Sequence, residues 1–313
     1  MNMILNSIDI DNGRGKVYLV DTVALGNARA VACYLIVDST GRVALVDTGY
    51  ASSIDELLRS LATLNISIED IDWIVPTHLH LDHAGAVGHI TRGSKGKGKG
   101  KIVAHERAVK HLIDPSRLIA SVKQVFGDYA ESFGYPIPVD PEDNTIIGVS
   151  KGGDGHTINL GSVELRCITA EGHAPHQIAV YINCNKPMLI TADSVSMLYP
   201  DYQCYIPTTP PPSFDAEQAI ATVERLSSRL DVKMLLMPHF GISSEPDAVF
   251  NATKEGINEW VGIIRQLLSE GYSHKAIEDR MVEHVKKGGM PPPSYIINSI
   301  RNSVKGIITY LTR

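Results

Sequence analysis

Short runs of apolar residues separated by polar turns dominate the first three quarters of the chain. Such runs, roughly four to eight residues long and bounded by turn residues, predict β-strands. The runs 16–20, 30–37 and 42–46 follow one another through tight turns and predict an antiparallel sheet. The stretch 137–160 is rich in Pro, Asp and Gly and predicts an irregular surface excursion. Further strands are predicted at 71–76, 102–105, 163–169, 178–182, 187–191 and 232–237.

Helical spacing of apolar residues appears between these strands and then takes over. Amphipathic helices are predicted after Ser53, across 105–113 and 116–132, and after Ser213. From about residue 245 the strand pattern stops. We therefore predict two parts, a catalytic domain over 1–244 and an all-helical extension over 245–313. The helices of the extension are predicted at 246–270, 273–287 and 294–311.

Composition excludes several classes of protein. The chain has 313 residues, is 43% hydrophobic and 20% charged, and carries a formal charge of -6. These values are typical of an ordinary soluble globular protein, and the negative charge predicts neither a nucleic-acid nor a membrane partner. Four cysteines without a C-x-x-C pair, and no basic leader or long apolar run, predict a cytoplasmic location. The lysine-glycine segment 93–101 predicts a solvated loop of open role, and the apolar stripes of the extension predict core packing or a homodimer contact.

The densest chemistry lies in His78-Leu79-His80-Leu81-Asp82-His83, directly after the predicted strand 71–76. Imidazole nitrogens and carboxylate oxygens are natural ligands of borderline divalent metals. His78 and His80 are two residues apart, so in an extended loop they point the same way. Asp82 and His83 lie past the turn and face a second position. The segment therefore predicts metal binding.

Three later side chains also follow predicted strands: His173, Asp193 and His239. Strands of packed sheets end on a common edge, so these groups can converge with the histidine loop although they are distant in sequence. Two clusters follow, with Asp193 able to bridge them because a carboxylate has two oxygens. One cluster is His78, His80 and His173; the other is Asp82, His83 and His239.

The chain resembles the metallo-β-lactamase superfamily, whose H-x-H-x-D-H signature stands at 78–83. Its other motifs have counterparts in Asp47-Thr48-Gly49, Gly172-His173, Ala192-Asp193-Ser194 and Pro238-His239-Phe240-Gly241, so the resemblance covers about residues 14–244. It implies an αββα four-layer sandwich, the same two-metal ligand set, and an Asp47 that holds the histidine loop by hydrogen bonds. One departure is Gly172-His173-Ala174-Pro175-His176-Gln177, where a glycine of the glyoxalase II-like pattern is missing. His176 is therefore predicted to orient a ligand or line the pocket.

A site with two divalent ions predicts a hydrolase. A hydroxide bridging them is a strong nucleophile near neutral pH, and Asp82 is the predicted catalytic residue that holds it and passes on a proton. Zinc is the first choice of metal, with iron or manganese as alternatives. Tyr199, Tyr202 and Tyr205 follow the bridging aspartate and are predicted either to donate a phenol hydrogen bond to the oxyanion or to form the pocket wall and pack the loop.

The predicted substrate is a small carbonyl ester, either a thioester or a lactone. The helical extension is similar in architecture to that of the glyoxalase II-like hydrolases. Two other activities of the same superfamily stay open. One is a phosphodiesterase or ribonuclease, and the other is an oxygenase similar to the mononuclear iron persulfide dioxygenases.

Overall fold

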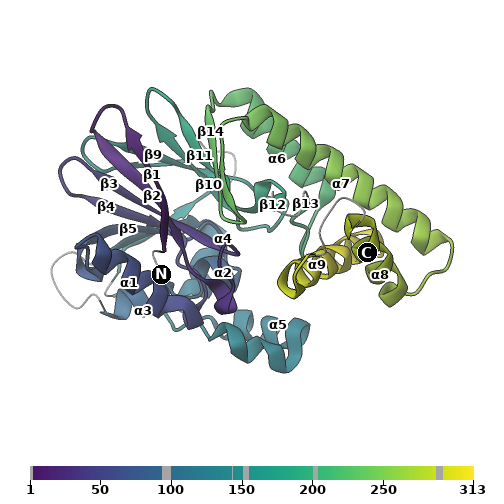
Figure 1. Cartoon of the computed structure of the whole chain (residues 1–313). Coiled ribbons are helices and arrows are strands. Elements are labelled where there is room, and N and C mark those ends of the chain that lie inside the picture. Colours follow the sequence, from purple (N-terminus) through teal and green to yellow (C-terminus); the bar gives the residue numbers. More distant parts are fainter. Residues whose placement is uncertain (1–2, 94–99, 143, 151–154, 200–203, 287–291) are drawn as a thin grey trace. The chain divides into compact units, whose positions relative to one another are not determined.

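The computed structural model describes the chain except for residues 1–2, 94–99, 143, 151–154, 200–203 and 287–291 (Figure 1). Most of the predicted loop 93–101 and the predicted site residue Tyr202 thus lie outside the described residues. The chain divides into two compact units, the first formed by residues 1–169 and 176–192, the second by residues 170–175 and 193–313. The domain boundary predicted at residue 244 stays a prediction.

A seven-stranded sheet forms the centre of the first unit, with its strands in chain order. The first four strands pair antiparallel, as predicted for the runs up to residue 46, and the last four pair parallel. Strands β3 and β4 are buried on both faces, which indicates an inner layer. The strands are β1 (Ile4–Ile10), β2 (Gly15–Asp21), β3 (Ala32–Asp38), β4 (Val43–Val46), β5 (Ile71–Val75), β6 (Lys101–His105) and β7 (Ile146–Val149).

Helices cover one face of this sheet (Figure 1). Leu57 and Leu61 of the first helix and Ile90 of the third join Leu35 and Leu45 of the sheet in one buried cluster. Burying such aliphatic side chains contributes roughly 1.5–3 kcal/mol each. The helices are α1 (Ile54–Thr63), α2 (Leu81–Ala84), α3 (Val87–Gly93), α4 (Glu106–Ile113) and α5 (Ser116–Phe126), with 3-10 turns η1 (Ala24–Gly26), η2 (Ala51–Ser53), η3 (Ile68–Asp70) and η4 (Gly127–Phe133).

Four more strands of the first unit pair antiparallel: β8 (His156–Asn159), β9 (Glu164–Thr169), β10 (Ile178–Asn183) and β11 (Met188–Ile190). The turn before β9 is tied to the larger sheet by Ser162, whose Oγ donates to Arg14 O at 2.6 Å and to Asp38 Oδ2 at 2.9 Å. The prediction that 137–160 is irregular is wrong, because β7 and β8 lie within it. Their sequences show little apolar alternation, and pairing with β6 and β9 makes them strands.

The second unit joins the C-terminal helices to the residues just after Asp193. Phe214, Trp260 and Ile300 belong to one buried cluster, so the extension shares its core with residues 197–219. Figure 1 shows α7 running beside α6. Of the described helices, none has the length and apolarity to cross a bilayer. The elements are β12 (Met197–Tyr199), β13 (Cys204–Ile206), α6 (Ala216–Arg229), β14 (Met234–Met237), β15 (Gly241–Ser243), α7 (Pro246–Ser269), α8 (His274–Lys286) and α9 (Ser294–Leu311), preceded by the 3-10 turn η5 (Ala192–Ser194).

Candidate metal centre

The histidine loop of the first unit, residues 77–83, connects β5 to the short helix α2. His78 and His83 are almost completely buried, whereas His80 and Asp82 keep some exposure. Backbone contacts hold the end of the loop, since Thr48 N donates to His83 O at 2.7 Å. Gly85 follows as a close-packing position, because a Cβ there would lie 2.3 Å from the carbonyl oxygen of Leu81.

Asp47 holds the loop through three hydrogen bonds. Its Oδ1 accepts from Thr77 N at 2.7 Å, and its Oδ2 accepts from Thr77 Oγ1 at 3.1 Å and from His83 Nδ1 at 2.8 Å. A carboxylate on Nδ1 keeps that nitrogen protonated and leaves Nε2 with its lone pair, the form that binds a metal. Asp47 thus makes hydrogen bonds of the kind that the family resemblance implied for it.

Potential ligand atoms of the loop lie close together. His78 Nε2 is 2.8 Å from His80 Nδ1, and His83 Nε2 is 3.7 Å from Asp82 Oδ2. The ligand atoms of His78 and His83 also lie within 4.8 Å of each other. Four donors from six consecutive residues are thus gathered on one loop, two of them away from water.

His176 lies against the histidine loop. Its ring is nearly parallel to that of His78, with centroids 6.3 Å apart, and its Nδ1 accepts weakly from Leu79 N at 3.4 Å. Burial, followed by the positive charges of His80 and His105, lowers the pKa of His176 to about 3. His176 is therefore neutral at pH 7 and can accept this hydrogen bond. The predicted alternatives for His176, orienting a ligand or lining the pocket, stay predictions.

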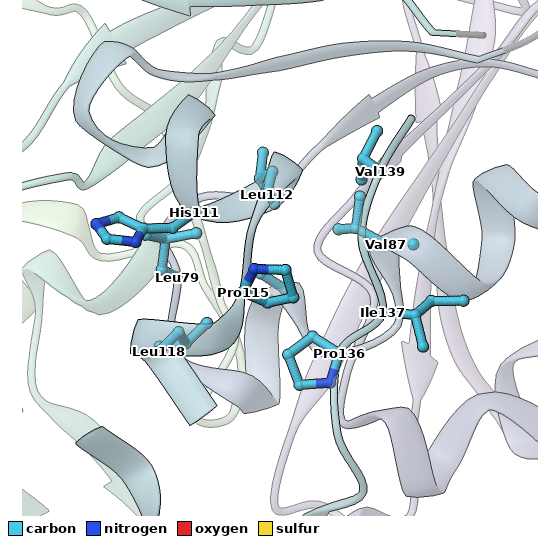
Figure 2. Close-up of a pocket in the computed structure, with 11 residues that line it drawn as sticks. Leu79, Val87, His111, Leu112, Pro115, Leu118, Pro136, Ile137 and Val139 are labelled. Atoms are coloured by element: carbon cyan, nitrogen blue, oxygen red, sulfur yellow. The ribbon is translucent and has the colours of Figure 1, made fainter. Parts of the chain in front are cut away.

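One apolar side chain of the loop, Leu79, packs into the interior of the first unit. Leu79 lines a narrow hollow with room for about one water molecule (Figure 2). Figure 2 shows His111 and Leu79 near one end of this hollow and Val87 and Val139 near the other. Because Leu79 is buried against α3, α4 and the 136–139 segment, the loop is fixed by packing as well as by hydrogen bonds.

A second group of potential metal ligands lies in the second unit. Oδ2 of Asp193 is 3.3 Å from Nε2 of His173 and 3.6 Å from Nε2 of His239. One carboxylate oxygen is therefore shared by two imidazole nitrogens. His239 stands in the turn between β14 and β15, and its backbone oxygen accepts from Leu198 N at 2.9 Å.

Two neighbours position His173, and motif reasoning missed one of them. Thr208 accepts from His173 Nδ1 through its carbonyl at 2.8 Å, which again leaves the lone pair on Nε2, the atom that faces Asp193. The hydroxyl of Thr208 donates to Asp193 O at 2.7 Å. Nothing in the sequence around Thr208 signals this, because the contact uses a backbone oxygen. Gly172 has φ +134°, and a Cβ there would lie 2.4 Å from Ala219 of α6, so only glycine fits.

The predicted tyrosines have different environments. Tyr199 is buried, its hydroxyl donates to Met197 Sδ at 3.7 Å, and its ring packs edge-on against Tyr295 of α9. Tyr205 is 46% exposed on β13. The roles predicted for Tyr199 and Tyr205 stay predictions.

The donor set fits a divalent metal. Two of its histidines, His83 and His173, have Nδ1 bonded to an acceptor, which leaves the lone pair on Nε2. Nitrogen and carboxylate oxygen without thiolate suit zinc, iron or manganese. The free cysteines Cys33 and Cys167 are buried, and burial raises the pKa of both thiols.

Comparison with known proteins gives a consistent family. A model of the metallo-beta-lactamase superfamily matches residues 26–239. A metallo-beta-lactamase fold-containing protein of Sulfurisphaera tokodaii is 25% identical over 206 residues, which cover 64% of this chain and 69% of that protein.

Solved structures show the same fold. An archaeal metallo-beta-lactamase superfamily protein from Sulfolobus tokodaii has a TM-score of 0.60 at 20% identity, covering 99% of this chain and 97% of its own. A family protein from Thermus thermophilus has a TM-score of 0.64 at 18% identity, with coverages of 90% and 88%. A class B3 di-zinc metallo-beta-lactamase from an Alaskan soil metagenome has a TM-score of 0.55 at 17% identity, with coverages of 82% and 94%. The predicted mixed α/β fold with a helical extension is confirmed.

Proposed function

The chain belongs to the metallo-beta-lactamase superfamily, and we propose that it is a hydrolase that uses two divalent metal ions to cleave a small carbonyl ester, either a thioester or a lactone. The proposed ligands of one ion are His78, His80 and His173, and those of the other are Asp82, His83 and His239. Asp193 is proposed as the ligand common to both.

The hydrogen bonds at Nδ1 carry this proposal. His83 donates from Nδ1 to Asp47, and His173 donates from Nδ1 to Thr208 O. The Nε2 atom of each ring therefore keeps the lone pair that can bind a metal ion. A histidine that served only to fill the core would have no need of an acceptor that fixes its tautomer, whereas metal-binding histidines almost always have one. The two histidines come from different units, and both have the same arrangement.

Bound divalent ions would supply Lewis acidity, which polarises the bond to be cut and lowers the pKa of water to about 7. The protein's own contribution is to orient the ligand side chains and to move protons. Asp82 is proposed for proton transfer, because its carboxylate is partly exposed beside the buried His83. No serine or cysteine nucleophile is required by this chemistry.

Metal analysis followed by a substrate panel tests the proposal. The purified chain, loaded with zinc, iron or manganese in turn, is expected to hold about two ions and to cleave thioesters or lactones. His239→Gln should lower the metal content to about one ion per chain. His274→Gln, at an exposed histidine of α8, is the matched control and should change nothing.

Three results would contradict the proposal. A fully metallated chain that leaves every thioester and lactone intact would refute the substrate class. A phosphodiester or RNA in the same panel, cleaved in preference to both, would establish the first alternative activity. A single iron per chain, together with oxygen consumption on a persulfide, would establish the second.

A further inference from the structure

We propose that an exposed group of aromatic side chains beside the histidine loop binds the apolar acyl part of the substrate. This inference rests on the proposed function and narrows its substrate class to esters with an aliphatic or aromatic acyl group. The group, called the aromatic cluster below, lies entirely within the first unit. It consists of Tyr50, Phe126, Tyr129 and Phe133.

Phe133 is the centre of the aromatic cluster. Tyr50 stacks on it with centroids 5.0 Å apart and an interplanar angle of 11°. Phe126 and Tyr129 meet it edge-on at 5.1 Å and 5.3 Å. These are favourable arrangements for aromatic pairs. The rings are therefore an ordered surface, although two of them face solvent.

The outer members of the cluster remain in water. Phe126 is 38% exposed and Tyr129 is 52% exposed, while Phe133 is only 5% exposed. The preceding helix, α5, contains no fully buried residue: Val125 is 36% exposed, whereas Leu118 and Val122 are partly buried against the Leu81 group. It has no acidic residue either. An exposed apolar surface of this kind commonly marks a ligand or partner site.

The aromatic cluster is joined to the histidine loop by packing. Phe133 belongs to the same buried group as Leu81, which stands between His80 and Asp82. Tyr50 follows Asp47-Thr48-Gly49 directly, and Asp47 holds the loop through Thr77 and His83. The cluster is therefore continuous with the loop through Leu81 and through the 47–50 segment, and the acyl group would rest on its exposed members.

Two backbone features hold the cluster in shape. Gly134 has φ +67°, and a Cβ there would lie 2.7 Å from Ser52 N, so Phe133 is brought tightly against the segment that follows Tyr50. On the other side, Leu25 packs against the Leu81 group with φ +52°. Strained residues of this kind cluster at functional sites.

Buried Asp21 stabilises that second segment. Its carboxylate accepts from Val23 N at 3.0 Å and from Arg29 N at 2.8 Å. Val23 itself has φ +47°, an outlier for a β-branched residue. The strained segment ends at Leu25, which packs against the Leu81 group. Leu25 therefore forms a second apolar wall that is independent of α5.

Continuity with the loop favours a substrate over another protein or a membrane. The exposed aromatic area is small, two side chains and part of one helix, whereas a stable protein–protein interface buries about 800 Å² per partner. Ligand sites combine apolar and aromatic walls with a few convergent polar groups. The cluster and the histidine loop together meet that description within one unit.

A series of thioesters of one thiol with acetyl, butyryl, hexanoyl and octanoyl groups tests the inference. Each added methylene should raise kcat/KM by about fourfold, the factor expected for one buried methylene. Phe126→Ala should lower kcat/KM for the octanoyl thioester by about fivefold and leave the acetyl thioester within about twofold. Leu58→Ala, at an apolar side chain of α1 that is 37% exposed and outside the cluster, should change neither.

Binding of an octyl thioether, which cannot be hydrolysed, separates this inference from the proposed function. Calorimetry on the metal-free chain should show binding that Phe126→Ala and Tyr129→Ala weaken. Binding of this kind without cleavage of any ester would support the aromatic cluster and refute the hydrolase. Cleavage that is independent of chain length and unchanged in Phe126→Ala would refute the cluster alone. Loss of self-association or of vesicle binding in Phe126→Ala, with thioester kinetics unchanged, would also overturn it.

Discussion

Replacing Asp47 by Asn tests how the histidine loop is prepared for metal. The backbone of Asp47 has φ +61°, a conformation that Asn tolerates well, so the substitution leaves the chain path intact. The amide keeps one oxygen, which can still accept from Thr77 N. Its NH2 group now faces His83 Nδ1 and donates to it. His83 then carries its proton on Nε2, the nitrogen proposed to bind the ion.

The expected cost follows from the buried contacts. His83 is 0% exposed, so water cannot replace the lost partner. Restoring the metal-binding tautomer leaves a buried amide donor without an acceptor, which costs about 1–3 kcal/mol. That corresponds to a loss of roughly 10–100-fold in metal affinity, the range typical of such supporting residues. The free energy of unfolding of the metal-free chain should fall by about 1–3 kcal/mol, since charge-assisted bonds become neutral ones.

Competition with a chromophoric chelator measures the affinity, and urea unfolding of the metal-free chain measures the stability. Asp38→Asn is the matched control. Asp38 is also buried and accepts from Thr40, Arg42 and Ser162, but at a turn that has no contact with the loop. It should lose stability and keep its metal affinity within about twofold. An Asp47→Asn variant with unchanged metal affinity would refute the tautomer argument and reduce Asp47 to a structural residue.

Three further predictions concern Asp38, Gly172 and Leu79. Burial raises the pKa of Asp38, but hydrogen bonds from Ser162, Thr40 and Arg42 outweigh it and lower the pKa from 3.8 to about 2. The ionised carboxylate therefore contributes about 2 kcal/mol to the free energy of unfolding above pH 4, and this contribution is lost as pH falls through 2. Urea unfolding at pH 7 and pH 3 should show a smaller acid sensitivity in Asp38→Asn, and an equal sensitivity would contradict the assignment. Gly172→Ala should destabilise the chain by several kcal/mol in a thermal melt, because the new Cβ meets Ala219 at 2.4 Å. The control is Gly271→Ala, which has φ +83° but open space around it and should cost about 1 kcal/mol. Leu79→Ala, at a 2% exposed position beside the hollow, should cost about 2–5 kcal/mol, and a loss below about 1 kcal/mol would show that the loop is not fixed by packing.

The sequence determined the elements that have a strong apolar signal and the order of the ligand types. The run 71–76 predicts a strand because it is apolar and ends at a proline, and the structure has β5 over Ile71–Val75. The helix predicted over 294–311 is found as α9 with the same bounds, because its apolar residues recur at helical spacing. His78, His80, Asp82 and His83 could be singled out from their own spacing, which needs no partner.

Only the tertiary structure decided the weaker elements and the supports of the site. Strand β8 contains one buried side chain, Ile158, so its pairing with β9 makes it a strand and its own sequence does not. The bond from His173 to Thr208 uses a backbone oxygen, which every residue has and no motif records. The aromatic cluster gathers Tyr50 with rings from about 80 residues further along the chain. Sequence patterns report which side chains must leave water or can bind metal, whereas contacts between distant residues exist only once the backbone brings them together.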